Sequence, residues 1–298
     1  NEIFGEENFV AQIVWERAYA PVNLKHHFSE SHDYIVCFAH NIDLLDKLSL
    51  KRNEAADARY KNPDNDPRGV WQSDNFSVGP ANQKNIYEII TPSGRRVLPP
   101  SGYSWRFSEN KTQELIADNR VWFGSSGSGV PRYKRFLSEV KDGVTPMTVW
   151  KYTDVGHSQD ATKEVKDLFD GVAYFDYPKP VKLIKQLASL CTDGNDIILD
   201  FFSGSASMAE AVMRKNAEDG GKRHFILVQI PEKASGQFST LTDIGEERIR
   251  RAGKKIAEEV EGSNRQLKIG GDSKPVPDIG FRVFSIDSSN FLDTYSEP

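Results

Sequence analysis

The chain has 298 residues, 38% of them hydrophobic and 27% charged, with a net charge of −5 at neutral pH. This length and composition exclude a small disulfide scaffold and a globally disordered chain, because enough apolar surface is present to form a core. No apolar run approaches the ~20 residues that cross a bilayer, so we expect no membrane role. At the start of the chain, residues 8–15 and 32–40 are rich in β-branched and aromatic side chains, which predicts two strands within residues 1–45.

The stretch from residue 46 to 160 has a different composition, with Pro, Gly, Asn and Ser recurring every few residues. This pattern predicts an irregular, loop-rich domain with short strands such as residues 85–90. The mixed charges of residues 46–59 are typical of a solvated helix. Lys and Arg slightly outnumber Asp and Glu in this stretch, which also holds four of the five tryptophans.

Residues 161–262 follow a regular α/β pattern. Pro178 and Pro180 precede an apolar stripe from Val181 to Cys191, which predicts a helix. The apolar runs 197–202 and 225–230 predict two strands, the first buried on both faces. A helix between them makes a βαβ unit, which implies a parallel sheet. Beyond it we expect a charged helix over 243–260 that stops at Gly262, and an extended tail over 263–298.

The turn between the first of these strands and its helix is the sharpest feature of the chain. It reads Asp200-Phe-Phe-Ser-Gly-Ser-Ala206, and parallel-sheet proteins bind nucleotides at such turns because small residues let backbone N–H groups approach the ligand. Gly204, Ala206 and Ala209 also form a weak version of the dinucleotide motif. On spacing alone, a tight turn without any ligand remains an equal alternative.

Several ordered motifs resemble those of S-adenosylmethionine-dependent DNA methyltransferases. Their cofactor loop is written D-x-F-x-G-S-G, and Asp200, Phe202, Gly204 and Ser205 are in register with it, while Ala206 replaces the last glycine. Further resemblance lies in residues 62–71, 175–184, 225–232 and 243–252, which look like segments of permuted amino-methyltransferases and of the modification subunits of type III restriction systems. Together the resemblance covers most of residues 1–285.

The resemblance implies a partial Rossmann-like methyltransferase fold of the α/β class with an inserted target-recognition domain. Its parts would be residues 1–45 as a strand pair, 46–160 as the DNA-binding insert, 161–262 as the cofactor-binding half and 263–298 as the tail. The implied activity is adenine-N6 methylation of duplex DNA in a restriction-modification system. The implied partners are double-stranded DNA, a restriction helicase-nuclease subunit and a second copy of the chain, all in the cytoplasm.

The family also implies residue roles. Asp200 would accept a hydrogen bond from the ammonium group of S-adenosylmethionine, and backbone N–H groups of residues 203–205 would face the cofactor. In the family, an acidic residue at the end of the second strand holds the ribose hydroxyls. Gln229 stands at that position, and Glu232 is the competing candidate because a carboxylate accepts hydrogen bonds more strongly than an amide. The expected cofactor-binding residues are Asp200, Phe201, Phe202, Ser203, Gly204, Ser205, Gln229, Glu232, Lys179 and Pro180.

The DNA-binding residues are expected among cations of the insert that alternate with Trp105, Trp122 and Tyr133. They are Arg95, Arg96, Arg106, Arg120, Arg132 and Lys134, with Arg135 beside them. No catalytic residue is assigned, because the Asp-Pro-Pro-Tyr motif of the family does not occur in this chain. The nearest string, Asn62-Pro-Asp-Asn65, is typical of a turn. We therefore expect a fragment that binds the cofactor weakly or not at all alone and transfers no methyl group.

Two other functions stay open at this point. A non-catalytic DNA-binding subunit would carry a vestigial loop, given Ala206 and Gln229. A nicotinamide-dependent oxidoreductase would need an acid at the end of the second strand, whereas Glu218 and Asp219 precede it. We expect no metal site, since the histidines lack partners at metal spacing, and the two cysteines fit buried thiols of a reducing compartment.

Overall fold

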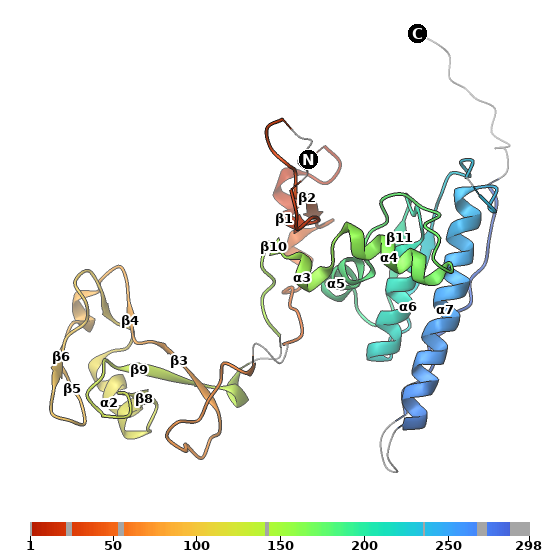
Figure 1. The fold of residues 1–298 in the computed structure, drawn as a ribbon. Helices are drawn as coiled ribbons and strands as arrows, with labels where there is room; N and C mark the ends of the chain where they lie inside the picture. Colours follow the sequence, from red (N-terminus) through yellow and green to blue (C-terminus); the bar gives the residue numbers. More distant parts are fainter. Residues whose placement is uncertain are drawn as a thin grey trace, which may run out of the picture. The chain divides into compact units, whose positions relative to one another are not determined.

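The computed structural model describes residues 2–21, 26–52, 57–140, 143–234, 236–266 and 273–286. The chain divides into two compact units, shown in Figure 1. The first unit comprises Asn1–Leu48 with Pro146–Pro298, and the second comprises Ser49–Thr145. The expected insert of residues 46–160 is therefore shorter in the structure, because its last part folds with the first unit.

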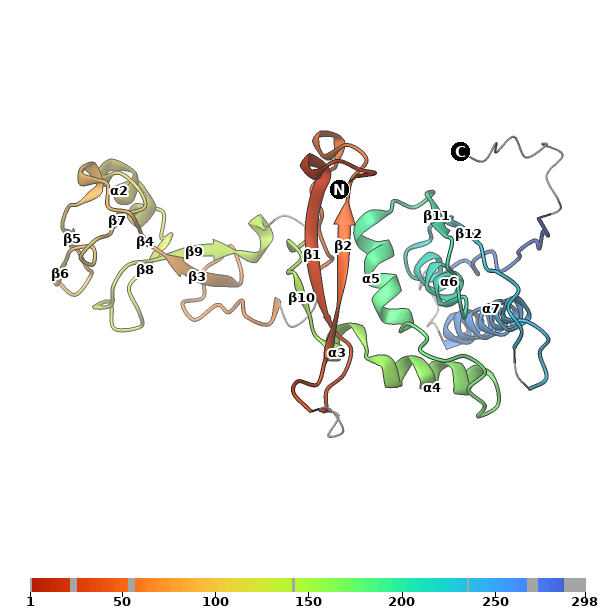
Figure 2. The ribbon, with the colours of Figure 1, turned by 90° about the horizontal axis from the view of Figure 1, so that it is seen from above.

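The first unit begins with an antiparallel hairpin of β1 (Phe9–Glu16) and β2 (His32–Phe38), which pair from Phe9 opposite Phe38 to Glu16 opposite His32. These strands confirm the two expected near the start of the chain. A short third strand, β10 (Val149–Trp150), lies parallel to β1 on its other edge, as Figure 2 shows. This pairing is the reason that residues after 145 belong to the first unit.

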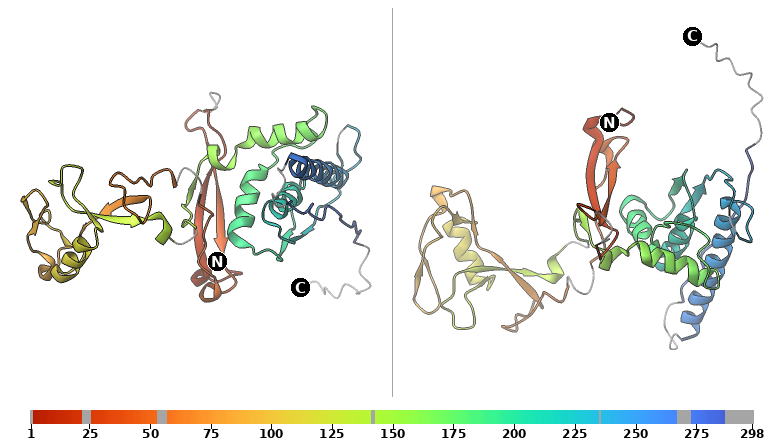
Figure 3. Two further views of the ribbon diagram at one scale, coloured as in Figure 1. Left: turned by 90° about the horizontal axis from the view of Figure 1, so that it is seen from below. Right: turned by 45° about the horizontal axis from the view of Figure 1, so that its top comes forward.

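Helices cover one face of this hairpin. The short α3 (Tyr152–Val155) and the predicted helix α5 (Val181–Cys191) supply Val155 and Leu183, which pack on Trp15 and Trp150. The predicted βαβ unit is also present: β11 (Ile197–Asp200), α6 (Ser207–Asp219) and β12 (His224–Leu227), with the two strands parallel and in register. In Figure 3, α6 lies between α5 and α7 (Leu241–Gln266).

A second core forms where α4 (Ser158–Leu168), α6 and α7 meet. Its fully buried members include Val165, Met213 and Ile256. Helix α7 continues through Gly262 to Gln266, so the stop expected at Gly262 is wrong: Gly262 keeps helical backbone, and Arg265 pairs with Glu261 one turn earlier.

The prediction that residues 197–202 form a strand buried on both faces is wrong. Side chains alternate along β11 and β12, and Phe225 and Leu227 pack on the helical core. On the opposite face Ile197, Leu199 and Ile226 are each more than half exposed. The reason is that this sheet has two strands in the described part of the chain, and helices cover one face of it.

The C-terminal residues 273–286 are extended and run along α7. Ile279 and Phe281 pack against the core of α4, α6 and α7, and the Phe281 ring centroid lies 5.3 Å from the guanidinium of Arg250. Asn264 and Lys274 exchange two hydrogen bonds at the end of α7. This part of the predicted tail is therefore held against the first unit.

The second unit is built from short strands, as its composition predicts. Its central sheet is antiparallel, with β9 (Arg132–Phe136) between β3 (Trp71–Asn75) and β8 (Val121–Trp122). Two further antiparallel pairs form separate sheets: β4 (Ser77–Val78) with β7 (Ser104–Trp105), and β5 (Ile89–Ile90) with β6 (Arg96–Val97). Helix α2 (Glu109–Ala117) and the strands enclose a core that includes Phe76, Ile89 and Leu115.

Single-turn 3-10 helices complete the chain at Glu6–Asn8, Ile42–Leu44, Gln83–Asn85 and Leu137–Glu139. The third of these occupies the start of the strand expected over residues 85–90, which shortens that strand to Ile89–Ile90. The helix expected over residues 46–59 is wrong for residues 46–52, which are not helical because Leu50 makes an antiparallel bridge with Val144; residues 53–56 lie outside the described residues. Among the described helices, none combines the length and the apolar character needed to cross a membrane.

Candidate cofactor site and nucleic-acid interface

The loop from Asp200 to Ala206 joins the carboxyl end of β11 to α6. Asp200 Oδ1 accepts the Phe202 N–H at 3.2 Å, and the Ser203 N–H donates to the carbonyl of Val228 at 3.1 Å. Gly204 and Ala206 both have left-handed backbone, with φ of 51° and 60°. Gly204 must also be small, because a Cβ there would lie 2.9 Å from Cζ of Phe175. The loop therefore has a compact and specific backbone path.

The aromatic residues of the loop point away from the core. Phe201 and Phe202 are 62% and 80% exposed, and their ring centroids are 5.1 Å apart. Asp200 beside them uses one carboxylate oxygen on the loop itself, and its other oxygen accepts no hydrogen bond from the residues that the structure describes. An acceptor next to open aromatic surface at a strand end fits a ligand with an ammonium group and a flat ring.

The backbone donors of the loop are less free than the sequence suggested. The Gly204 N–H donates to Oε1 of Gln229 at 2.7 Å, and the Ser203 N–H is held by Val228. Of the three N–H groups expected to face a cofactor, only that of Ser205 makes no hydrogen bond to the described residues.

Gln229 and Glu232 were the two candidates for holding ribose hydroxyls. The amide of Gln229 is occupied at both ends, since its Nε2 donates to the carbonyl of Ile230 at 3.1 Å while its Oε1 accepts from Gly204. Glu232 is exposed. Its N–H donates to the carbonyl of Ile230 and its own carbonyl accepts from Leu241, while its carboxylate makes no hydrogen bond to the described residues. The structure thus gives Gln229 a role in bracing the loop, whereas the described residues do not engage the Glu232 carboxylate.

Lys179 and Pro180 lie at the start of α5. Pro180 is buried and lies close to Gly156, since a Cβ built at Gly156 would be 3.0 Å from the Cβ of Pro180. The Lys179 ammonium lies 5.2 Å from the ring centroid of Trp15 and 3.7 Å from Asp33. Phe175 connects this segment to the loop of residues 200–206 through its contact at Gly204, whereas Lys179 itself contacts the hairpin of β1 and β2.

Sequence reasoning missed two charged residues beneath the loop, Arg248 of α7 and Glu210 of α6. Both are buried, and Arg248 Nη2 lies 3.0 Å from Glu210 Oε2. A signal was present, because Arg248 stands four residues before Ala252 on the apolar face of α7, where a cation must find a buried partner. Glu164 was also missed: it accepts the first N–H of α5, from Val181, and burial raises its pKa.

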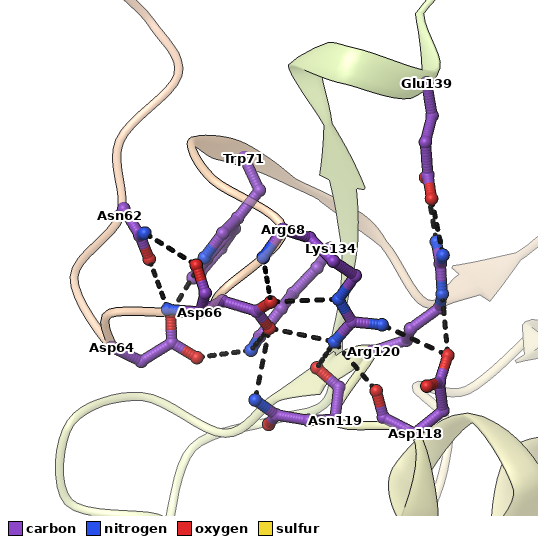
Figure 4. A network of polar contacts seen from close by, with 10 residues as sticks. All are labelled: Asn62, Asp64, Asp66, Arg68, Trp71, Asp118, Asn119, Arg120, Lys134 and Glu139. Carbon is purple, nitrogen blue, oxygen red and sulfur yellow. Dashed lines mark hydrogen bonds and ion pairs between the residues drawn. The ribbon is translucent and has the colours of Figure 1, made fainter.

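In the second unit, Lys134 is wholly buried and not part of any DNA-facing surface. Figure 4 shows its ammonium group against Asp64 and Asp66, at 3.1 Å from the latter, and the ring centroid of Trp71 is 5.3 Å away. Arg68 pairs with the same Asp66 at 2.9 Å. The expected DNA contact by Lys134 is therefore corrected to a structural role. The turn at residues 62–65 has the same role, since Asn62 bonds both backbone groups of Asp66.

Arg120 is also neutralised within the second unit. It pairs with Asp118 at 2.9 Å and with Glu139 through both ends of its guanidinium, as Figure 4 shows. Its hydrogen bonds hold the pKa of Glu139 below the ordinary value. Arg120 is therefore a poor candidate for a DNA contact, and so is Trp105 as a stacking residue, because it is buried in the core.

The other cations of the predicted set stand at the surface. Arg96 is 70% exposed and pairs with Glu88 at 2.8 Å. Arg106 and Arg135 share Asp74, and Arg132 donates to Asn75 at 2.6 Å. Arg95 donates to the carbonyl of Ser128. Within the described residues, no group of three or more His, Cys, Asp or Glu side chains is placed to hold a metal ion.

Comparison with known proteins assigns the family. Residues 1–254 match the DNA methylase family, and the chain belongs to this family. It is 33% identical to the StyLTI Mod subunit, a type III restriction-modification enzyme of Salmonella typhimurium, over 90% of the chain and 41% of that protein. It is 25% identical to the EcoP15I Mod subunit of Escherichia coli, over 86% of the chain and 45% of that protein.

A type II methyltransferase is similar as well: M.KpnI of Klebsiella pneumoniae is 24% identical over 77% of the chain and 57% of that protein. The chain thus spans roughly half the length of the curated relatives that it matches. The family expected from the residues around Asp200 is confirmed by these matches.

Proposed function

We propose that this chain forms the cofactor-binding and DNA-contacting part of a DNA adenine-N6 methyltransferase of a restriction-modification system. The observation that carries the proposal is the loop at Asp200, which places a carboxylate and two exposed aromatic rings at the carboxyl end of β11. Membership of the DNA methylase family and similarity to type III Mod subunits support it. Duplex DNA is the proposed substrate, and a restriction subunit and a second copy of the chain are proposed partners.

S-Adenosylmethionine is the proposed cofactor, and when bound it supplies an activated methyl group on sulfur. In this proposal the free oxygen of Asp200 accepts a hydrogen bond from the cofactor ammonium group, and Phe202 covers the ligand. Glu232 takes the role of ribose acceptor, because within the described part of the chain its carboxylate has no hydrogen-bond partner, whereas the Gln229 amide is engaged at both ends. Lys179 and Pro180 form the side of the pocket next to α5.

The finer fold assignment, a Rossmann-like sheet that this chain forms in part, belongs to the same proposal. Two observations support it: β11 and β12 are parallel, and Ile197, Leu199 and Ile226 leave an apolar face of the pair exposed. Parallel sheets are normally covered on both faces. A larger sheet would account for this apolar surface.

The target-recognition role is proposed for the second unit. Its cations Arg95 and Arg96 are exposed and Arg132 is partly exposed. Among the described residues none of the three pairs with two carboxylates as Arg120 does, and none is buried as Lys134 is. Exposed arginines of this kind bind phosphates and base edges.

The nicotinamide alternative is weakened by the structure. Its acid would stand at the end of β12, but Asp219 precedes that strand and pairs with Lys215 and Arg223. Calorimetric titration of the 298-residue chain with S-adenosylmethionine, and separately with NADH, discriminates between the two. We expect weak binding of the sulfonium compound and none of NADH.

The matched variants are Asp200→Asn at the carboxyl end of β11 and Asp193→Asn in the segment between α5 and β11, and each removes one negative charge. We expect Asp200→Asn to lower affinity for S-adenosylmethionine by about tenfold, because it removes a charged acceptor. Asp193→Asn should leave affinity unchanged. Equal affinity of the Asp200 variant and the wild type, or tighter binding of NADH, contradicts the proposal.

A further inference from the structure

The buried guanidinium of Arg248 contacts the loop of residues 200–206, the proposed cofactor loop, from the side of α7. Arg248 is fully buried, and its Nη1 donates to Oγ of Ser205 at 2.9 Å and to Oγ of Ser207 at 3.0 Å. Its Nε and Nη2 both donate to Glu210 Oε2, at 3.3 and 3.0 Å. One side chain of α7 therefore ties the loop to a buried carboxylate of α6.

The two serines stand on either side of Ala206. Ala206 has left-handed backbone and precedes α6 without a side-chain cap, an arrangement that costs free energy for any residue with a Cβ. Such a conformation persists when its surroundings hold it in place. Arg248 contacts both neighbours of Ala206 at once, so it is placed to hold this turn.

The same face of α7 brings the helix close to the loop. A Cβ at Gly245 would lie 3.5 Å from Cβ of Ala206 and 3.6 Å from the carbonyl oxygen of Gly204. Gly245 stands three residues before Arg248, on the same side of the helix. The small residue permits the close approach that lets the guanidinium reach both serines.

We propose that Arg248 is a positioning residue for the cofactor loop: it holds Ser205 and Ser207 so that the loop keeps its ligand-binding shape before the cofactor arrives. The proposal deepens the proposed function and rests on it. It differs from a general packing role because only the planar fork of arginine can donate to Glu210 and to two hydroxyls together. A lysine keeps the charge and loses that geometry.

Arg214 offers a matched control. Its Nε lies 3.0 Å from the other oxygen of Glu210, and its Nη1 pairs with Glu259 at 2.9 Å, but among the described residues it makes no hydrogen bond or ion pair to the loop. Arg248→Lys and Arg214→Lys make the same chemical change on either side of one carboxylate. Only the first changes the contacts to Ser205 and Ser207.

Two measurements on the 298-residue chain test the proposal. The first is amide hydrogen exchange over residues 203–208 without cofactor, and the second is calorimetric affinity for S-adenosylmethionine, with thermal unfolding recorded for each variant. For Arg248→Lys we expect exchange about tenfold faster and affinity about tenfold weaker, the latter equivalent to about 1.4 kcal/mol. Arg214→Lys should change each by less than about twofold. Ser207→Ala, which leaves every charge in place, should change both in the direction of Arg248→Lys and by less.

Equal effects of the two lysine variants, or unchanged exchange in Arg248→Lys, overturn the positioning role. If Arg248→Lys does not fold, Ser207→Ala decides: unchanged exchange and affinity in that variant overturn it too. If the wild type binds no S-adenosylmethionine, the proposed function loses its support, while the exchange measurement still decides whether Arg248 holds the loop.

Discussion

Lys134 shows how a buried cation can organise a loop-rich unit. Its ammonium group is enclosed by Asp64, Asp66 and the ring of Trp71, and it is fully removed from solvent. Removing one member of a buried ion pair leaves the remaining charge without compensation. The strand β9 and the turn at residues 62–66 should therefore depend on this one side chain.

We predict that Lys134→Met lowers the free energy of unfolding of the second unit by about 3 kcal/mol, because Asp64 then lacks its charged partner. Arg132→Met, two residues earlier on β9 and at the surface, should cost less than about 1 kcal/mol. Urea denaturation followed by tryptophan fluorescence measures both changes, since Trp71, Trp105 and Trp122 lie in this unit. A similar cost for the two variants would contradict the role of the buried pair.

The same cluster should make the second unit sensitive to acid. Hydrogen bonds from Arg68 hold the pKa of Asp66 well below its ordinary range. Burial alone would raise the pKa of Asp64, but hydrogen bonds from Lys134 and Trp71 keep it below its ordinary value. The unfolded chain, with an Asp pKa of about 3.9, therefore takes up protons first as the pH falls.

We expect the stabilisation by these two carboxylates to be complete above about pH 5 and to decline progressively below about pH 4. The free energy of unfolding, measured in urea at intervals from neutral pH to pH 3, should fall over that range. In Asp66→Asn the decline should be shallower. An equally steep decline in that variant would show that other groups cause the acid sensitivity.

The family could be predicted from the sequence, whereas the structural role of Lys134 could not. The Asp200 loop was recognisable because its chemistry depends on consecutive residues, and consecutive residues are what a motif records. Lys134 was assigned to DNA because a cation near aromatic residues looks the same whether it is buried or exposed. Its two aspartates lie about 70 positions away in the sequence, so only the fold brings them together.

At the scale of elements, the packing of residues 273–286 on α7 depends on one glycine. A Cβ at Gly253 would lie 3.0 Å from Cβ of Ile279 and 3.5 Å from Sδ of Met213. We predict that Gly253→Val displaces this segment, because the added methyl groups occupy the place of Ile279. Gly262→Val is the matched control on the same helix, since a Cβ there has no neighbour within 4 Å.

Limited trypsin digestion measures this displacement. Cleavage after Arg282 should be several-fold faster in Gly253→Val than in the wild type, because a released segment enters a protease more readily. Gly262→Val should be cleaved at the wild-type rate. Unchanged cleavage in Gly253→Val would mean that α7 itself adjusts to the larger side chain.

Elements were predicted well where the periodicity was long and less well where burial decided the outcome. The helix Val181–Cys191 has a regular apolar stripe and was located correctly. The run at residues 197–202 was read as a strand with two buried faces, whereas β11 ends at Asp200 and exposes Leu199 on one face. Composition gives the apolar character of a strand, but the number of neighbouring strands and helices decides how many of its faces are covered.

At the scale of the whole molecule, the order of the strands limits what a sequence can reveal about domains. The change of composition near residue 46 lies within a few residues of the start of the second unit, because the loop-rich sequence begins there. Its end was placed too late. The strand Val149–Trp150 joins β1 through a parallel pairing across more than 130 residues, and no local pattern records such a partner.

The net charge of the molecule limits how it can bind DNA in the proposed function. The net charge of −5 gives no general attraction to a polyanion, so affinity must come from local cations. We predict that duplex DNA binds through the second unit, and that replacing Arg95, Arg96 and Arg132 by Gln weakens it at low salt. Each lost phosphate contact makes the slope of log affinity against log salt smaller by about one unit. The slope of the triple variant should therefore be smaller than that of the wild type by up to about three units.

The control removes three cations from the exposed side of α7, Arg250, Lys254 and Arg265, again by exchange for Gln. It changes the net charge by the same amount but leaves the second unit intact. Fluorescence anisotropy of a labelled duplex, titrated at several salt concentrations, gives both slopes. An equal decrease of the slope in the two triple variants would show that binding follows net charge alone. The proposal that the second unit contacts DNA would then be wrong.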